Sequence, residues 1–365
     1  MHVAILIGHF PPGSFGGAEI QAEGWAKRLS DRHRVTVLTR RDPPEQPERE
    51  ERDGFTVLRL PVSRVPLWRT FADVAAIEAA LAKLSPRPDV LLCFQTFVSG
   101  LAGVRAGRAL GVPAIVWIRG EAEYRLRDSR VHGWVSPRVW SGAAAVLVQS
   151  EQNRVDLLHE LDRHAPARVA AMRAKLGVIG NGLDLPDGPF APGTRVTSVG
   201  RLIADKGMDV VIDAARAASL PLTICGEGPE RAALEARAAG HDVRFTGFVS
   251  RAALEGVLRD TRIAVLAARR GEGLPNVLLE AMAYARPVIA TPCAGTRDLL
   301  VDGVNGLVIP PDDAPALAAA LRRLAGDPAL AARLGAEARR TAERFAWDAV
   351  RPALETALER ARAGS

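Results

Sequence analysis

Two glutamates, Glu272 and Glu280, stand eight residues apart on either side of a Gly-Leu-Pro turn. Pro275 suits the first position of a helix, where a backbone N–H would have no partner. The N–H groups of Asn276 and Val277 would then lie at the positive end of the helix dipole, an arrangement that binds phosphate well. This stretch therefore predicts a phosphate site at the start of a helix.

The two carboxylates would flank that phosphate. Glu280 lies about one turn into the predicted helix, and helical side chains lean back towards the N-terminus, so its carboxylate could reach hydroxyl groups beyond the phosphate. Glu272, on the loop before the turn, could bind a second polyol from the other side. A phosphate between two sets of hydroxyls is the chemistry of a sugar nucleotide. A surface helix with two solvated acids is the alternative.

Two other loops carry groups suited to phosphate. Gly16 and Gly17 follow the first predicted strand, and glycines there let the backbone approach an anion closely; an ordinary tight turn is the alternative. Arg201 and Lys206 follow the first strand of the second half. Arg201 offers a planar fork for phosphate oxygens and Lys206 a compact charge, although both residues would also fit salt bridges on a solvated loop.

The loop that contains Arg119 and Glu121 follows the predicted strand 114–118 and would face a cleft. Basic and indole side chains are frequent around it, namely Trp68, Arg69, Arg125, Arg127, Arg130, His132, Trp134, Arg138 and Trp140. Such a mixture suits an anionic, amphiphilic acceptor or a membrane interface. It equally suits an arginine-rich surface over half-buried tryptophans.

Several classes of protein lack their characteristic motifs here. The seven histidines show no metal-ligand spacing, there is no Asp-x-Asp motif, and the three cysteines are scattered, so we expect no metal, no other cofactor and no disulfide framework. The segment Gly226–Gly228 lacks the third glycine of a dinucleotide fingerprint, which argues against a nicotinamide enzyme. A P-loop and a Gly-x-Ser-x-Gly elbow are also missing. We expect no nucleic-acid partner.

Short apolar strands alternate with amphipathic helices, which predicts an α/β fold of two Rossmann-like, doubly wound parallel sheets. In the first half, strands are expected at 2–8, 35–38, 56–60, 89–94, 114–118 and 145–148, with a loop at 42–53 and an irregular region before 145. In the second half they are expected at 195–199, 222–225, 243–246, 263–266, 287–291 and 306–309. The linker-like stretch 185–193 separates domains 1–182 and 183–345, and ligands should bind at the carboxyl ends of the strands or in the cleft between domains.

The net charge of +6 is unevenly distributed. Residues 1–182 hold 25 Lys and Arg against 19 Asp and Glu, whereas residues 183–365 hold 23 of each kind. A basic partner surface would therefore belong to the first half. The chain opens directly on an apolar strand without a charged leader, so we expect a cytoplasmic protein that can contact the inner face of an anionic membrane peripherally.

Together these motifs resemble the retaining GT-B glycosyltransferases of family GT4, most strongly over residues 177–345. The Glu272–Glu280 pair resembles the family's E-x7-E motif, and it accompanies Gly200-Arg201, Lys206-Gly207 and Asn181-Gly-Leu-Asp184. The resemblance implies two domains facing each other across a cleft, and a final helix, 346–365, that crosses back to the first. It implies an enzyme that moves a sugar from a nucleotide-diphosphate sugar to a glycan or lipid-linked acceptor in cell-envelope or exopolysaccharide synthesis.

The resemblance also assigns roles. Arg201 and Lys206 would bind the donor diphosphate with the amides of Asn276 and Val277 and the Gly16-Gly17 loop. Glu280 would hold the ribose, Glu272 the transferred sugar, and Val249 would lie at the base. Catalysis would then rest on Arg201, Lys206 and Glu272, and Arg119 and Glu121 would face the acceptor.

Arg119 departs from the family, because many members carry a histidine at this position. A guanidinium cannot act as a general base. The departing phosphate could act as the general base, and Arg119 could bind an acidic acceptor instead. Two alternatives stay open: an inactive sugar-nucleotide-binding scaffold subunit, and a GT-B enzyme that epimerises or hydrolyses its sugar nucleotide.

Overall fold

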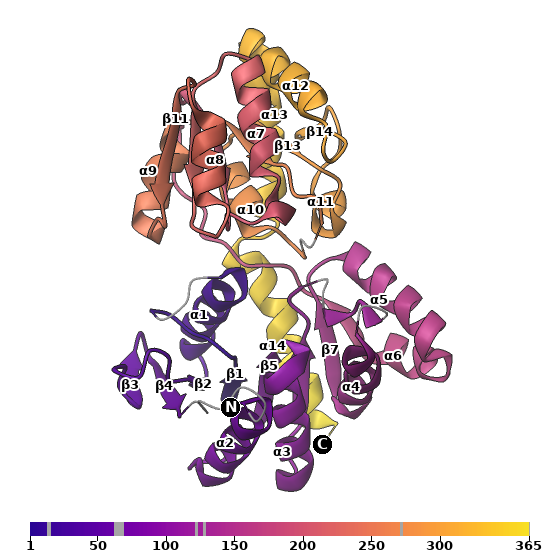
Figure 1. The fold of residues 1–365 in the computed structure, drawn as a ribbon. Helices are drawn as coiled ribbons and strands as arrows, with labels where there is room; N and C mark the ends of the chain where they lie inside the picture. Colours follow the sequence, from indigo (N-terminus) through magenta and orange to yellow (C-terminus); the bar gives the residue numbers. More distant parts are fainter. Residues whose placement is uncertain (13–15, 62–68, 121–122, 127–128, 271–272, 365) are drawn as a thin grey trace. The chain divides into compact units, whose positions relative to one another are not determined.

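The computed structural model describes residues 1–12, 16–61, 69–120, 123–126, 129–270 and 273–364 (Figure 1). The chain divides into two compact units: unit 1 is Met1–Gly182 with Val350–Ser365, and unit 2 is Leu183–Ala349. Each unit is built on one sheet, and the paired strands described run parallel except β3 and β4. The predicted α/β class with two parallel sheets is therefore confirmed.

Unit 1 contains an eight-stranded sheet in the order β3-β4-β2-β1-β5-β6-β7-β8. The order reverses between β1 and β5, which is the switch point of a doubly wound sheet. Its strands are β1 His2–Leu6, β2 Arg34–Arg40, β3 Arg49–Arg52, β4 Phe55–Leu60, β5 Val90–Phe94, β6 Ala114–Trp117, β7 Ala145–Val148 and β8 Leu176–Val178.

Two sequence-based expectations for unit 1 were wrong. Strand β3 lies within 42–53, which was expected to be a loop, because it is a charged edge strand without an apolar pattern; Glu50, for example, pairs with the buried Arg59. Charge on an edge strand discourages further pairing. Helix α4, Arg130–Gly142, lies in the region expected to be irregular. Ser129 caps it by accepting from the His132 N–H, and it buries Trp140.

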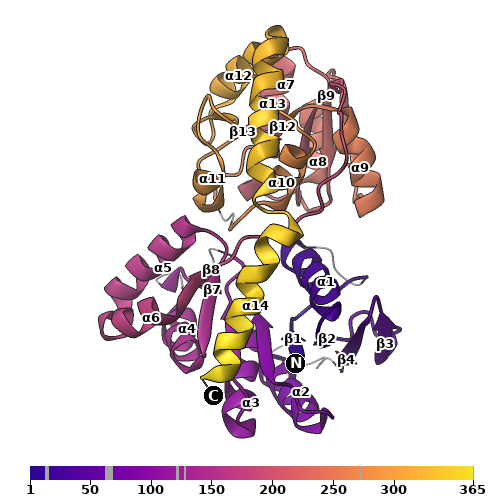
Figure 2. The ribbon, with the colours of Figure 1, turned by 180° about the vertical axis from the view of Figure 1, so that it is seen from behind.

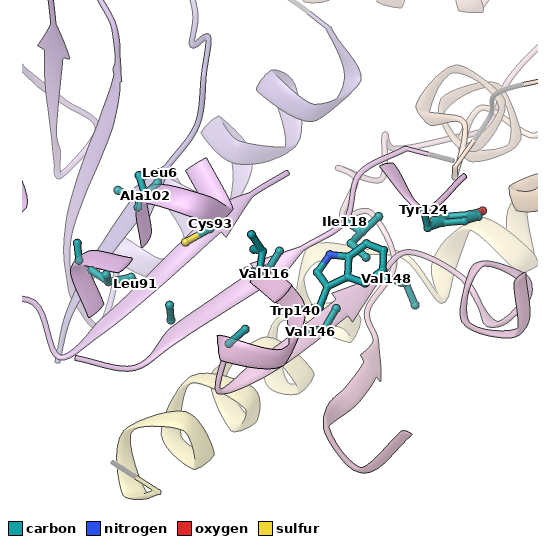
Figure 3. Packing of buried hydrophobic residues seen from close by; sticks show 14 of the residues in the cluster. Leu6, Leu91, Cys93, Ala102, Val116, Ile118, Tyr124, Trp140, Val146 and Val148 are labelled. Carbon is teal, nitrogen blue, oxygen red and sulfur yellow. The ribbon is translucent and has the colours of Figure 1, made fainter. Parts of the chain in front are cut away.

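The helices of unit 1 cover both faces of the sheet. Figure 3 shows one face, where Leu6, Cys93, Val116 and Val146 from neighbouring strands pack with Trp140. Helix α14 runs along the strands of unit 1 in Figure 2. The pairs Arg351–Asp31, Arg32–Glu355 and Arg362–Asp89 join it to the residues directly after α1 and directly before β5. The helices are α1 Gly17–Ser30, α2 Arg69–Lys83, η2 Thr96–Gly100, α3 Leu101–Leu110, α4, α5 Glu151–His164, η5 Pro166–Arg168, α6 Val169–Lys175 and α14 Trp347–Ala363.

Unit 2 contains a six-stranded sheet in the order β11-β10-β9-β12-β13-β14, which reverses between β9 and β12. Ile263 and Val265 of β12 pack in one core cluster, and the alternate residues Ala264 and Leu266 pack in another. The strand is therefore buried on both faces, as expected of a parallel sheet. The strands are β9 Arg195–Val199, β10 Leu222–Cys225, β11 Val243–Gly247, β12 Thr261–Leu266, β13 Val288–Ala290 and β14 Leu307–Val308.

Three helices of unit 2 begin at a polar side-chain cap. Ser250, Asp313 and Asp327 each accept a backbone N–H three residues further on, which satisfies a free donor of the first turn. The helices of unit 2 are η6 Ala204–Lys206, α7 Met208–Ala217, α8 Arg231–Ala238, α9 Arg251–Asp260, α10 Asn276–Ala283, α11 Ala294–Leu299, α12 Ala314–Gly326 and α13 Pro328–Glu343.

Candidate functional site

The switch point of unit 2 brings two of the predicted loops to the same edge of the sheet. Strand β9 lies between β10 and β12, with Thr197 opposite Ala264 and Val199 opposite Cys225. The loop that carries Arg201 and Lys206 follows β9, and the stretch leading to α10 follows β12. Ligands of doubly wound sheets bind where two such loops diverge.

The loop after β9 is closely packed against the segment after β12. Gly207 has a φ of 63°, and a Cβ atom there would lie 2.2 Å from the carbonyl oxygen of Ala267. Only glycine fits such a position without strain. Lys206, directly before it, is half-buried, whereas Arg201 is exposed and its side chain makes no hydrogen bond to any described residue. Arg201 is thus available to a ligand.

Arg269 and Arg270 bind to the loop after β9, and the sequence analysis did not identify them. The Arg269 N–H donates to the Asp205 carbonyl at 2.8 Å, and its guanidinium lies 2.8 Å from the carboxylate of Asp209. Arg270 pairs with the Asp205 carboxylate at 3.0 Å. Two consecutive arginines at a strand end were the available signal. They fix the backbone that positions Lys206.

Helix α10 begins at Asn276, and Pro275 occupies the N-cap rather than the first helical position. Pro275 precedes the helix with φ −75° and ψ 109°, and its carbonyl accepts from the N–H groups of Leu278 and Leu279 at 3.2 Å. The Val277 N–H has no acceptor among the described residues. The first turn therefore still offers a donor to an anion. Glu272 lies outside the described residues.

Glu280 lies one turn into α10 with a half-buried side chain. Burial raises the pKa of its carboxyl to about 7, and the positive charge of Arg251 acts in the opposite direction. The carboxyl therefore changes its charge close to neutral pH. A ligand that donates hydroxyl hydrogen bonds to the carboxylate would favour the ionised form.

Val249 lies two residues beyond the end of β11, at the same edge of the sheet. Gly247, where β11 ends, has a φ of 70°, and its carbonyl accepts from the Gly226 N–H at 2.8 Å. Phe248 is 56% exposed, and Val249 is half-buried. An aromatic ring and a branched side chain thus follow the end of β11.

In unit 1, Gly16 and Gly17 occupy the predicted position at the start of α1, and both are exposed. Glu19 folds back over them, because a Cβ atom on Gly16 would lie 2.3 Å from a carboxylate oxygen of Glu19. A glutamate in the first turn stabilises the positive end of the helix. An anion bound at Gly16 would have to displace the Glu19 carboxylate, a competition that the sequence analysis did not foresee.

Arg119 follows β6 and is only 8% exposed. Its guanidinium lies 4.9 Å from the ring of Trp117 and 5.3 Å from that of Phe94, and its Nη2 donates to the Asn181 Oδ1 at 2.6 Å. Burial lowers the pKa of Arg119 to about 9, although Glu123 and Glu19 act to raise it. Glu121 lies outside the described residues.

Glu123 shapes the loop around Arg119, and the sequence analysis missed it. Its carboxylate accepts from the backbone N–H groups of Thr96 at 2.6 Å, Arg119 at 2.7 Å and Gly120 at 3.1 Å. Burial nevertheless raises the pKa of this carboxyl overall. The only sequence signal was an acidic residue four positions after Arg119.

The predicted residues thus divide between two sheet edges. Described residues of the predicted donor site are Arg201, Lys206, Val249, Asn276, Val277 and Glu280 in unit 2, and Gly16 and Gly17 in unit 1. Arg119, predicted to face the acceptor, also lies in unit 1. Within the described part of the chain, no three His, Cys, Asp or Glu residues gather as metal ligands would. In the same part, the helices are too short or too polar to cross a membrane.

Two family models match the chain. Glycosyl transferases group 1 matches residues 193–327, and the glycosyl transferase 4-like domain matches residues 16–174. Alpha-D-kanosaminyltransferase from Streptomyces kanamyceticus is 31% identical over 268 residues, which cover 63% of this chain and 66% of that protein. Glycogen synthase from Mycobacterium tuberculosis is 28% identical over 394 residues, which cover 96% of this chain and 92% of that protein. The chain spans only 38% of an exopolysaccharide phosphotransferase from Streptomyces coelicolor, which is 28% identical.

Solved structures share the fold at low sequence identity. Sucrose-phosphate synthase from Thermosynechococcus elongatus matches with a TM-score of 0.83 at 21% identity, and both chains are covered completely. HepE from Anabaena, in complex with UDP and glucose, matches with a TM-score of 0.78 at 19% identity, with 98% of this chain and 99% of that chain covered. Both likenesses concern the GT-B fold.

Proposed function

Because the chain belongs to the group 1 glycosyltransferases of family GT4, which transfer a sugar from a nucleotide sugar, we propose that it is a retaining glycosyltransferase. It moves a hexose from a nucleotide-diphosphate sugar to a glycan or lipid-linked acceptor in cell-envelope or exopolysaccharide synthesis. The observation that carries this proposal is the switch point of unit 2. There the Arg201–Lys206 loop and helix α10 with Glu280 follow neighbouring strands.

The donor would bind along this edge. Arg201 and Lys206 bind the diphosphate, together with the amides of Asn276 and Val277. Glu280, in its ionised form, accepts hydrogen bonds from the ribose hydroxyls. HepE, which shares the fold, was crystallised in complex with UDP and glucose, and this supports a nucleotide as the ligand class.

The remaining donor contacts complete the proposal. Val249 lies beside the base and Glu272 holds the transferred sugar. The Gly16-Gly17 loop contributes to the phosphate site once Glu19 has moved aside.

Catalysis in this proposal is electrostatic. Negative charge develops on the departing diphosphate, and Arg201 and Lys206 stabilise it in the transition state. Glu272 orients the sugar. Because Arg119 cannot accept a proton, the departing phosphate receives the proton of the acceptor hydroxyl. No metal enters this scheme.

Contact with an anionic membrane is a further part of the proposal. Val131 and Trp134 on α4 are 62% and 61% exposed, and the exposed Arg130 and Arg138 lie on the same helix. Arg138 stacks on the Trp134 ring at 4.1 Å. Exposed apolar and indole side chains with arginines suit the surface of an anionic bilayer, where a lipid-linked acceptor would be found.

Thermal shift with UDP, GDP, ADP and their sugar conjugates tests the donor site. A ligand that binds only the folded chain raises the Tm, and we expect this with one nucleotide family. Glu280→Ala and Lys206→Ala should each abolish the shift and the turnover. The controls Glu235→Ala and Lys83→Ala alter exposed residues on α8 and α2 and should keep both. Retained activity in both site variants would refute the assignment.

Analysis of products then separates the remaining possibilities. Transfer to an acceptor supports the proposed reaction. Free sugar or an epimer would identify an enzyme that acts on its sugar nucleotide alone, and nucleotide binding without any product would identify a scaffold subunit.

A further inference from the structure

Arg119 is a buried cation with incomplete hydrogen bonding. It is 8% exposed, and its Nε and Nη1 atoms have no hydrogen-bond partner among the described residues. Burying a charge without pairing it costs free energy, and unsatisfied buried groups are rare in folded proteins. The residue therefore needs an explanation beyond packing.

The surrounding acids do not neutralise it by direct pairing. Glu123 uses its carboxylate for three backbone N–H groups, including that of Arg119 itself. Glu19 acts on Arg119 through its charge, but within the described residues neither acid forms a salt bridge with the guanidinium. The positive charge is thus left available.

The guanidinium is nevertheless held in place. The rings of Trp117 and Phe94 lie 4.9 and 5.3 Å from it. Its Nη2 donates to the Asn181 Oδ1, which also accepts from the Gln149 amide at 2.9 Å. A planar guanidinium fixed in this way is ready to bind a planar or tetrahedral oxyanion through its remaining nitrogens.

Space is open at the next residue, Gly120. A Cβ atom added to Gly120 would meet no atom of the described residues within 4 Å. The loop also lies at the carboxyl end of β6, which pairs with β5, one of the two strands that flank the switch point of unit 1. Ligands of doubly wound sheets bind at this end of the strands.

We propose that Arg119 binds an oxyanion, a carboxylate or a phosphate group, on the acceptor sugar. This inference rests on the proposed function, since it names the class of acceptor that the enzyme takes. An acceptor with such a group pairs with the buried charge, and a neutral acceptor leaves it unpaired. The site would therefore discriminate against neutral sugars.

Titration calorimetry with glucuronate, glucose 6-phosphate and methyl glucoside, at constant ionic strength, tests this. The chain of residues 1–365 should bind at least one anionic probe more tightly than the neutral one. Arg119→Gln should weaken that binding by about tenfold or more, and Arg119→Lys, which keeps the charge but loses the fork, should weaken it less. Arg138→Gln is the matched control, because it removes an arginine that also stacks on an indole ring but is exposed.

The folded state of Arg119→Gln can be checked by circular dichroism and by its Tm. Asn181 keeps the hydrogen bond from Gln149 in this variant, so folding should be preserved. Arg119→Met, which removes every donor, gives a second variant with the same expected loss.

The outcomes distinguish this inference from the donor-site proposal. Nucleotide binding should persist in Arg119→Gln and be lost in Glu280→Ala, whereas binding of the anionic probe should show the opposite pattern. Binding of glucuronate alone would identify a carboxylate acceptor, and binding of glucose 6-phosphate alone a phosphorylated one. Equal affinities of the original chain and Arg119→Gln, equal binding of the neutral sugar, or no binding of either anion would overturn the inference.

Discussion

Replacing Glu280 by glutamine should remove a pH dependence from the stability of unit 2. Burial raises the pKa of the Glu280 carboxyl to about 7 in the folded chain, whereas its ordinary value is 4.5. The folded state therefore binds the proton more tightly than the unfolded state. Proton binding to Glu280 therefore stabilises the folded state fully below pH 4.5, and this stabilisation is lost as the pH rises through 7. Glutamine mimics the protonated form at every pH.

The two pKa values set the size of the effect. A difference of about 2.5 between the two pKa values, at about 1.4 kcal/mol for each whole pKa step, gives an upper limit of about 3.5 kcal/mol. The side chain is half-buried rather than fully buried, and screening by solvent reduces this to about 2 kcal/mol between pH 5 and pH 8. This is a large share of the stability of an ordinary domain.

The assay is urea unfolding of both chains at pH 5, 6, 7 and 8, with the free energy of unfolding extrapolated to water. The quantity of interest is the difference between Glu280→Gln and the original chain at each pH, because other titrating groups cancel in it. That difference should grow in favour of the variant as the pH rises. Nucleotide affinity provides a second readout and should fall as the pH drops below 7, since the protonated carboxyl accepts ribose hydroxyls less well.

A difference that stays constant from pH 5 to pH 8 would refute the raised pKa. A difference that grows in favour of the original chain would show that Glu280 is stabilised as an anion in the free protein. In that case Arg251, the positive charge near it, would outweigh burial.

Three other perturbations follow from the structure. Gly207→Ala should lower the free energy of unfolding by about 1–3 kcal/mol in urea titrations, because the new methyl group would collide with the Ala267 carbonyl; Gly240→Ala, also at positive φ but with open space, should cost less. Burial lowers the pKa of His2, so its contribution to stability is present above pH 6.5 and lost as the pH falls towards the folded pKa; His2→Gln should flatten this acid-side loss in the same titration. Trp134→Ala should weaken sedimentation with vesicles of anionic lipid while leaving the Tm unchanged, and undiminished vesicle binding would count against the membrane surface on α4.

The family, the fold class and the glycosyltransferase activity were predictable from the sequence. The strands of unit 2 were located to within a few residues, because strands that are buried on both faces have continuous apolar sequences. Strand β3 and helix α4 were missed, since the charges of β3 and the arginines and tryptophans of α4 hide the usual periodicity. Their positions depend on tertiary neighbours rather than on local pattern.

The environment of the site residues was less accessible to sequence reasoning. Arg119 lies against Trp117 and Phe94 because β5 and β6 pair with those two residues in register, and no local pattern encodes that register. The position of the Glu19 carboxylate over Gly16 likewise depends on loop conformation. The same holds for the ion pairs of Arg269 and Arg270 with Asp209 and Asp205. The roles of Arg201, Lys206, Glu272 and Glu280 stay predictions.

Helix α14 has a consequence for the order in which the chain can fold during synthesis. Its residues from Val350 onward belong to unit 1, and Leu354 and Leu358 are fully buried. The ribosome delivers these residues only after all of unit 2. Unit 2, whose sequence is continuous, can complete its core first, whereas unit 1 must wait with an uncovered apolar face. An expressed fragment that ends at Gly182 would keep that face exposed and is expected to aggregate.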